Sequence, residues 1–101
     1  MLKIGIIFSM AWTVHIKKKV QRNIRQLPDR IQYALKILIK EIAELGPVRG
    51  NWQNYSSLPD NRHHCHLKHG HPTYVAVWEV TDKDIKITEV IYAGTHEKAP
   101  Y

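Results

Sequence analysis

The chain has 101 residues, which is enough for one compact domain and too few for two ordinary ones. Hydrophobic residues make up 44% of it, which argues against disorder, and no apolar run is long enough to span a membrane. Fifteen Lys and Arg against nine Asp and Glu give a net charge of +6, which favours a polyanionic partner, either nucleic acid or an acidic protein segment. An ordinary lysine-rich surface is the alternative that charge alone leaves open.

The N-terminal segment, residues 1–10, contains a short apolar run without a convincing signal-peptide cleavage site. Met10 stands just before a credible first strand, so we expect residues 1–10 to be an extension of a single domain at 11–101. The extension either adds little to the fold or supplies an extra strand or a partner-binding arm. Cys65 is the single cysteine, so no disulfide can form within the chain, which fits a cytoplasmic protein.

The first half of the domain predicts one strand and two helices. Residues 12–16 alternate and are β-prone, which indicates a strand. A short helix is expected at about 17–27, where apolar residues recur at helical spacing before Pro28. The apolar stripe between residues 31 and 45 predicts a longer helix, which the Gly-Pro pair at 46–47 should end.

The second half predicts strands. Residues 46–62 should form a loop with aromatic anchors, and three strands should follow at 65–68, 73–80 and 85–93. The order of a strand, two helices and an antiparallel meander predicts an α+β domain with its helices packed on one face of the sheet. Trp52, Trp78 and Cys65 are expected to pack in the interior.

The two predicted helices are strongly basic. Residues 17–40 hold eight Lys or Arg against one acid, Asp29. Such a run is usually a solvated face, but this one is long enough to follow a line of phosphates or to bind an acidic protein segment. RNA contacts are expected at its start, from Lys17, Lys18, Lys19 and Arg22.

Five histidines fall between residues 63 and 71. A metal site is one interpretation, but strand alternation separates His64 and His66 from His63 and Cys65, and no Cys-x-x-Cys pair supports a closed site. An exposed polar hairpin is a second interpretation. The third is acid–base chemistry, since histidine titrates near neutrality and can both take and give the protons that RNA cleavage moves. We therefore expect neither a metal nor a cofactor.

Three segments in this order resemble the RelE/ParE toxin superfamily, and within it the YafQ-like mRNA interferases. They are residues 65–68 (CHLK), 74–80 (YVAVWEV) and 94–96 (GTH). Residues 50–52 (GNW) resemble the Gly-x-Trp segment that precedes the meander in those proteins. The resemblance covers about residues 11–101.

The resemblance implies a RelE-like fold and the toxin of a type II toxin–antitoxin system. Such a toxin cleaves mRNA in the decoding site of the ribosome, inhibits translation, and is held silent by a cognate antitoxin. It implies catalytic roles for His66 and His96, with Lys68 supplying charge as in RelE-like members. RNA contacts are expected from Arg62, His64, Lys98 and Tyr101, the last of which stands near the family's terminal aromatic.

The sequence departs from the YafQ-like pattern after His66, where the turn is longer by about three residues. No counterpart of their turn aspartate is found, and His69 or His71 could fill its place. Two other functions stay open. One is a ParE-like toxin that acts on DNA gyrase without cutting RNA, and the other is a degenerate toxin that serves as a binding module. The paired histidines His66 and His96 disfavour the ParE-like function.

Overall fold

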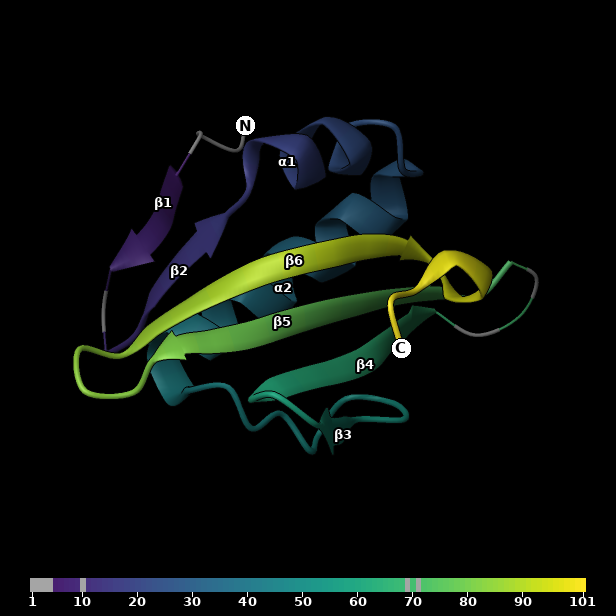
Figure 1. The fold of residues 1–101 in the computed structure, drawn as a ribbon. Helices are drawn as coiled ribbons and strands as arrows, with labels where there is room; N and C mark the ends of the chain where they lie inside the picture. Colours follow the sequence, from purple (N-terminus) through teal and green to yellow (C-terminus); the bar gives the residue numbers. More distant parts are fainter. Residues whose placement is uncertain (1–4, 10, 69, 71) are drawn as a thin grey trace.

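The computed structural model describes residues 5–9, 11–68, 70 and 72–101, and their elements are shown in Figure 1. In chain order they are β1 (Gly5–Ser9), β2 (Thr13–Ile16), α1 (Lys18–Ile24), α2 (Asp29–Leu45), β3 (Ser56–Leu58), β4 (Arg62–Lys68), β5 (Tyr74–Asp82), β6 (Ile87–Thr95) and a 3-10 turn η1 (His96–Lys98). The α+β class and the order of elements confirm the prediction.

The strands form one mixed sheet in the order β1-β2-β6-β5-β4-β3. The antiparallel meander of β4, β5 and β6 was expected. Strand β2 pairs with β6 and runs parallel to it. The connection between these two strands contains both helices and the strands β3, β4 and β5. Residues 5–9 of the predicted extension pair with β2 as an edge strand. A separate status for the whole extension stays a prediction, since residues 1–4 and 10 lie outside the described residues.

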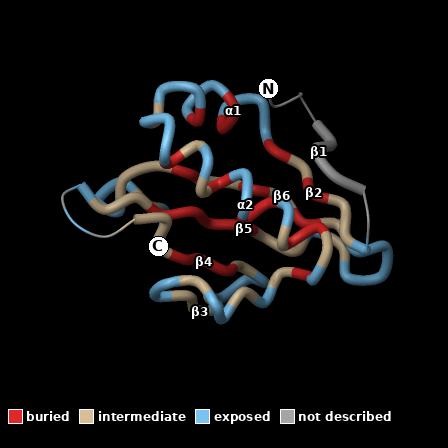
Figure 2. Tube along the Cα trace, turned by 180° about the vertical axis from the view of Figure 1, so that it is seen from behind, coloured by how far each residue is buried: buried red, intermediate tan, exposed pale blue. Residues whose placement is uncertain are grey.

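Both helices lie on one face of the sheet, as predicted. Figure 1 shows α2 behind the strands, and Figure 2 shows the buried band that runs through α2 and the central strands. The apolar stripe of α2 is the helical half of the core, and Trp78 and Val90 belong to the sheet half. Each such side chain stabilises the fold by roughly 1.5–3 kcal/mol when it is fully buried. No helix in the described part of the chain is long and apolar enough to cross a membrane.

The predicted loop at 46–62 contains a short strand that the sequence analysis missed. Ser56–Leu58 forms β3 and pairs with the start of β4. The turn between them places Asp60 and Asn61 at φ of 64° and 60°, a left-handed conformation that Asp and Asn tolerate better than most residues. β4 consequently begins at Arg62 rather than at Cys65.

The predicted bounds of α1 and β6 were wrong, as was the end of β5, which continues to Asp82 rather than ending at residue 80. Helix α1 ends at Ile24, a few residues earlier than expected, and β6 runs from Ile87 to Thr95 rather than from 85 to 93. The carboxylate of Asp82 explains the second difference. It accepts the backbone N–H groups of Asp84 and Ile85 at 2.9 and 3.0 Å, so the turn extends over Ile85 and leaves its side chain 66% exposed.

Candidate active site

The side chains of β4 divide between the two faces of the sheet. Cys65 is fully buried in the core, as predicted, and burial raises the pKa of its thiol to about 12. His63 points to the same side, where its ring stacks on those of Trp78 and Tyr55 at centroid distances of 5.9 Å each. The Tyr55 hydroxyl lies 2.7 Å from Nδ1 of His63. His63 is therefore part of the interior, and burial lowers its pKa.

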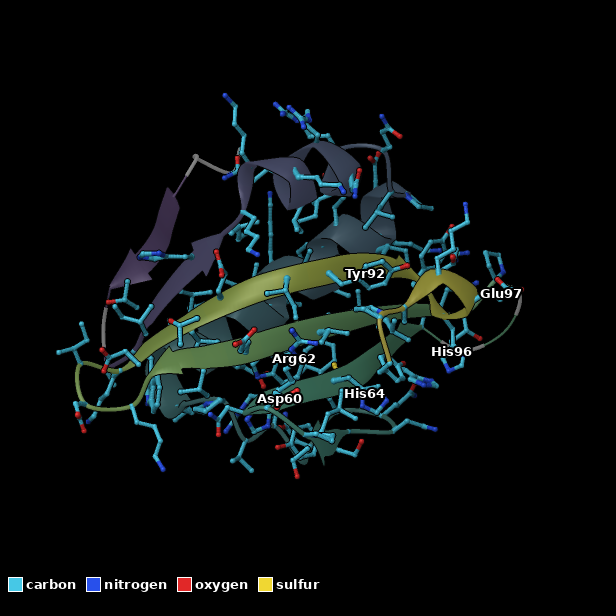
Figure 3. All side chains as sticks on the ribbon, in the orientation of Figure 1. Asp60, Arg62, His64, Tyr92, His96 and Glu97 are labelled. Atoms are coloured by element: carbon cyan, nitrogen blue, oxygen red, sulfur yellow. The ribbon has the colours of Figure 1, made fainter. Side chains whose placement is uncertain are left out.

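The neighbouring residues His64 and His66 project from the opposite face, which we call the open face. Their rings lie 5.9 Å apart, and two residues from the C-terminal tail join them. The ring of His96 is 5.5 Å from that of His66, and the ring of Tyr101 is 4.6 Å from that of His64 and 6.0 Å from that of His96. These four residues form the histidine cluster, and Figure 3 shows two of them, His64 and His96, in front of the sheet.

Two hydrogen bonds and the small size of Gly94 fix the path by which the tail returns over the sheet. The N–H of His96 donates to the carbonyl of Thr73 at 2.8 Å, and the turn η1 then redirects the chain. The Tyr92 hydroxyl donates to the carbonyl of Thr95 at 2.7 Å. A Cβ at Gly94 would lie 2.8 Å from that hydroxyl, so a larger residue where the tail leaves the strand would displace the Tyr92 side chain.

A bulge in β6 places Tyr92 beside the cluster. Val77 pairs with Tyr92 but Trp78 pairs with Val90, so one extra residue, Ile91, stands between the two pairs. Simple alternation would put Tyr92 on the core face with Val90. The extra residue moves it to the face of His64, whose register partner is also Val77. The sequence analysis did not identify Tyr92, because nothing local marks the bulge.

The electrostatics of the cluster favour neutral imidazole at His64. Burial lowers its pKa, a hydrogen bond to the Ser56 backbone raises it, and the charge of His96 lowers it again, with a net decrease. Nδ1 of His64 also lies 2.9 Å from the Ser56 hydroxyl. A neutral imidazole near pH 7 can accept a proton, whereas an imidazolium cannot.

Three further predicted residues, Arg62, Lys98 and Lys68, lie outside the histidine cluster, and they differ in the face that they occupy. Arg62 shares the open face and lies 3.5 Å from the carboxylate of Glu79, while Lys98 is exposed on η1. Lys68 follows a register shift in β4 and pairs with Tyr74, so alternation no longer places it on the face of His66. It nevertheless lines an open hollow together with His66.

The basic start of α1 belongs to another part of the molecule. The structure leaves all four of its predicted RNA contacts exposed. However, α1 follows β2, and the sheet order places β6 and β5 between β2 and the strand that carries His64 and His66. The four residues are Lys17, Lys18, Lys19 and Arg22. An RNA contact there stays a prediction, and it is not part of the histidine cluster.

A polar loop beside the cluster was also missed. One oxygen of Glu41 accepts from the side chains of Asn51, Trp52 and Arg49 at 3.0, 2.9 and 3.3 Å. Burial raises the pKa of Glu41, but these hydrogen bonds and the charge of Arg49 outweigh it, so the net pKa lies below the ordinary value. The indole of Trp52 is partly buried against the core, as expected. The sequence shows the polar run from Asn51 to Gln53, but it does not show that Glu41 on α2 lies beside this run.

No group of three or more His, Cys, Asp or Glu side chains among the described residues could hold a metal ion. The two turn histidines, His69 and His71, lie outside the described residues. The open face carries three imidazoles, a phenol and nearby cations. This set can take a proton, give a proton and bind a phosphate.

Comparison with solved structures supports the fold. The chain is similar to a double mutant of the E. coli toxin RelE in the free state, with a TM-score of 0.65 over 87% of this chain and 86% of that chain. The sequences are 22% identical. No family model and no curated protein matches the sequence. The chain therefore has the RelE-like fold that its sequence predicted.

Proposed function

We propose that this chain is the toxin of a type II toxin–antitoxin system and that it cleaves mRNA on the ribosome without a metal. The histidine cluster is the observation that carries the proposal. His66 and His96 are thirty positions apart in sequence, and their rings lie 5.5 Å apart on the open face. The RelE-like fold supports the same class of protein.

The proposed reaction moves two protons. A neutral histidine takes the proton from a ribose 2′-hydroxyl, whose oxygen attacks the adjacent phosphorus. The bond from phosphorus to the 5′-oxygen breaks, and a second histidine protonates that oxygen, which leaves a 2′,3′-cyclic phosphate on one fragment. His66 and His96 are suited to these two roles, and Lys68, Arg62 and Lys98 supply positive charge for the transition state.

Two members of the cluster serve the substrate in other ways. His64 has Nδ1 beside Ser56, so proton transfer or hydrogen bonding to RNA would use Nε2. Tyr101 is 49% exposed, and its ring can stack on a base of a single-stranded substrate. The ribosome would hold the mRNA in a reactive geometry, and such positioning can supply several kcal/mol of the barrier, within a general range of about 7–11 kcal/mol.

The test is cleavage of mRNA on translating ribosomes, followed by mapping of new ends. Wild type should produce discrete ends within reading frames. His66→Ala and His96→Ala should each lower the rate by about 100- to 10,000-fold, the usual effect of losing a proton-transfer group. His15→Ala is the matched control. His15 lies on β2, and two strands, β6 and β5, separate β2 from the strand β4 that carries His66.

Full activity of His96→Ala would contradict the proposal. An absence of new ends from wild type, accompanied by DNA breaks that depend on gyrase, would replace it with the ParE-like function. We expect cleavage to survive a chelator when the magnesium that the ribosome needs is maintained separately. Loss of activity with a stoichiometric bound metal would overturn the metal-free chemistry.

A further inference from the structure

An open hollow lies beside the histidine cluster at the edge of β4. β3 pairs with β4 only from Arg62 to His64, so from His66 onward the outer edge of β4 meets the preceding loop instead. The N–H of His66 donates to the carbonyl of Gln53 at 2.8 Å, which fixes the loop to the strand. The hollow has a volume of about 440 Å³ and is lined by Asn51, Trp52, Gln53, His66, Leu67 and Lys68.

The walls of this hollow are held in place before any ligand arrives. Glu41 accepts hydrogen bonds from both Asn51 and Trp52, and these bonds contribute to the net decrease of its pKa. The Gln53 carbonyl is held by β4 from the other side. A site formed in advance loses little free energy to ordering when it binds.

The lining has the chemistry of a nucleotide site. Carboxamides can donate to and accept from the edge of a base, and an indole offers an aromatic surface for stacking. Lys68 adds a cation that suits a phosphate. The amide nitrogen of Asn51 is already bonded to Glu41, whereas Gln53 is exposed. Gln53 is thus the residue best able to present a donor and an acceptor together.

We propose that this hollow binds the nucleotide next to the scissile phosphate and that Gln53 reads its base, with a preference for adenine. His66 lines the hollow and belongs to the cluster, so a base held there places its phosphate beside the proton-transfer groups. Adenine offers the neighbouring donor and acceptor that a carboxamide pairs with in two hydrogen bonds. The inference rests on the proposed function, because it assigns a substrate position within the same site.

The experiment measures binding without cleavage. Trinucleotides with 2′-deoxy sugars, which cannot be cut, carry A, C, G or U at the tested position. The Trp52 indole N–H, identified with Trp52→Phe, reports binding by NMR. The adenine form should bind wild type about 5- to 150-fold more tightly than the others. Gln53→Ala should abolish the preference, and the matched control Gln26→Ala, at an exposed position after α1, should keep it.

The ends mapped on ribosomes give an independent second measurement. Wild type should favour cleavage next to adenine, and Gln53→Ala should flatten this distribution while cleavage continues. Equal binding of all four trinucleotides, no shift of the Trp52 signal, or a preference retained in Gln53→Ala would overturn the subsite. Cleavage by wild type without base preference would do so too, and would leave the proposed function standing. An adenine preference in binding without any cleavage would sustain the subsite and sink the proposed function.

Discussion

His63 and His64 are adjacent in the chain and equally buried, each with 9% of its surface exposed, but different parts of the molecule cover them. His63 is enclosed by Tyr55 and Trp78, which are parts of the packed interior. His64 is covered by Tyr101, a tail residue that is itself half exposed. The exposed fraction alone therefore cannot separate a structural histidine from a functional one. The two can be separated by asking which part of the molecule covers each histidine. A substrate can displace a tail residue such as Tyr101, but it cannot displace the core residues that cover His63.

The largest expected effect is on cleavage at the open face. His64→Ala should lower the rate on ribosomes by about tenfold or more, because the range for losing a group that transfers protons begins near 100-fold and His64 is proposed to assist rather than to lead. The free energy of unfolding should fall by less than in His63→Ala, because the groups that cover His64 belong to the tail and to an edge strand rather than to the core. A rate equal to wild type would show that His64 only supports Tyr101.

The complementary change on the core face should act on stability. His63→Ala leaves the Tyr55 hydroxyl without its partner and opens space beside Trp78, which should cost about 1–3 kcal/mol of the free energy of unfolding. Chemical denaturation measures this, and cleavage per folded molecule should stay near wild type. If His63→Ala lost cleavage and kept stability, the assignment of the two faces would be reversed.

A smaller effect is expected on the helical side of the molecule. The exposed cations of α1 form the surface that we expect an acidic antitoxin segment to bind. Charge reversal in Lys18→Glu with Arg22→Glu should weaken antitoxin binding by about tenfold and reduce its dependence on salt. Calorimetry at two salt concentrations tests this. The thermal unfolding midpoint of the free variant is the control for folding, because both side chains are exposed. An unchanged affinity at both salt concentrations would remove the idea.

The smallest effect concerns pH. The pKa values of His63 and His64 lie below the ordinary 6.5, so the unfolded chain binds more protons than the folded one as the pH falls through that value. The free energy of unfolding should therefore decrease below about pH 6.5, and Glu41 should add a further decrease below 4.5. Denaturation at a series of pH values measures the slope. His63→Phe should flatten it between pH 7 and 5.5, and a stability that rises towards pH 5.5 would contradict these pKa directions.

Much of the fold could be predicted from periodicity and composition. The stripe of α2, the meander and the buried Trp78 and Cys65 follow from side-chain spacing, because the same spacing decides which residues can be removed from water together. The strand β3 could not be predicted this way, since three residues carry too little pattern and depend on the turn at Asp60 and Asn61.

The sequence by itself determined that β4 has histidines on both faces and that a further histidine follows the last strand. Only the tertiary structure brought His96 to His66 and Tyr101 to His64, through the Thr73 contact and the returning tail. It also decided the face of Tyr92 and the hollow beside Gln53. The face of Tyr92 depends on the bulge in β6, and the hollow depends on the end of β3 and on the carboxylate of Glu41. Local sequence does not encode them, because each is set by a partner distant in the chain.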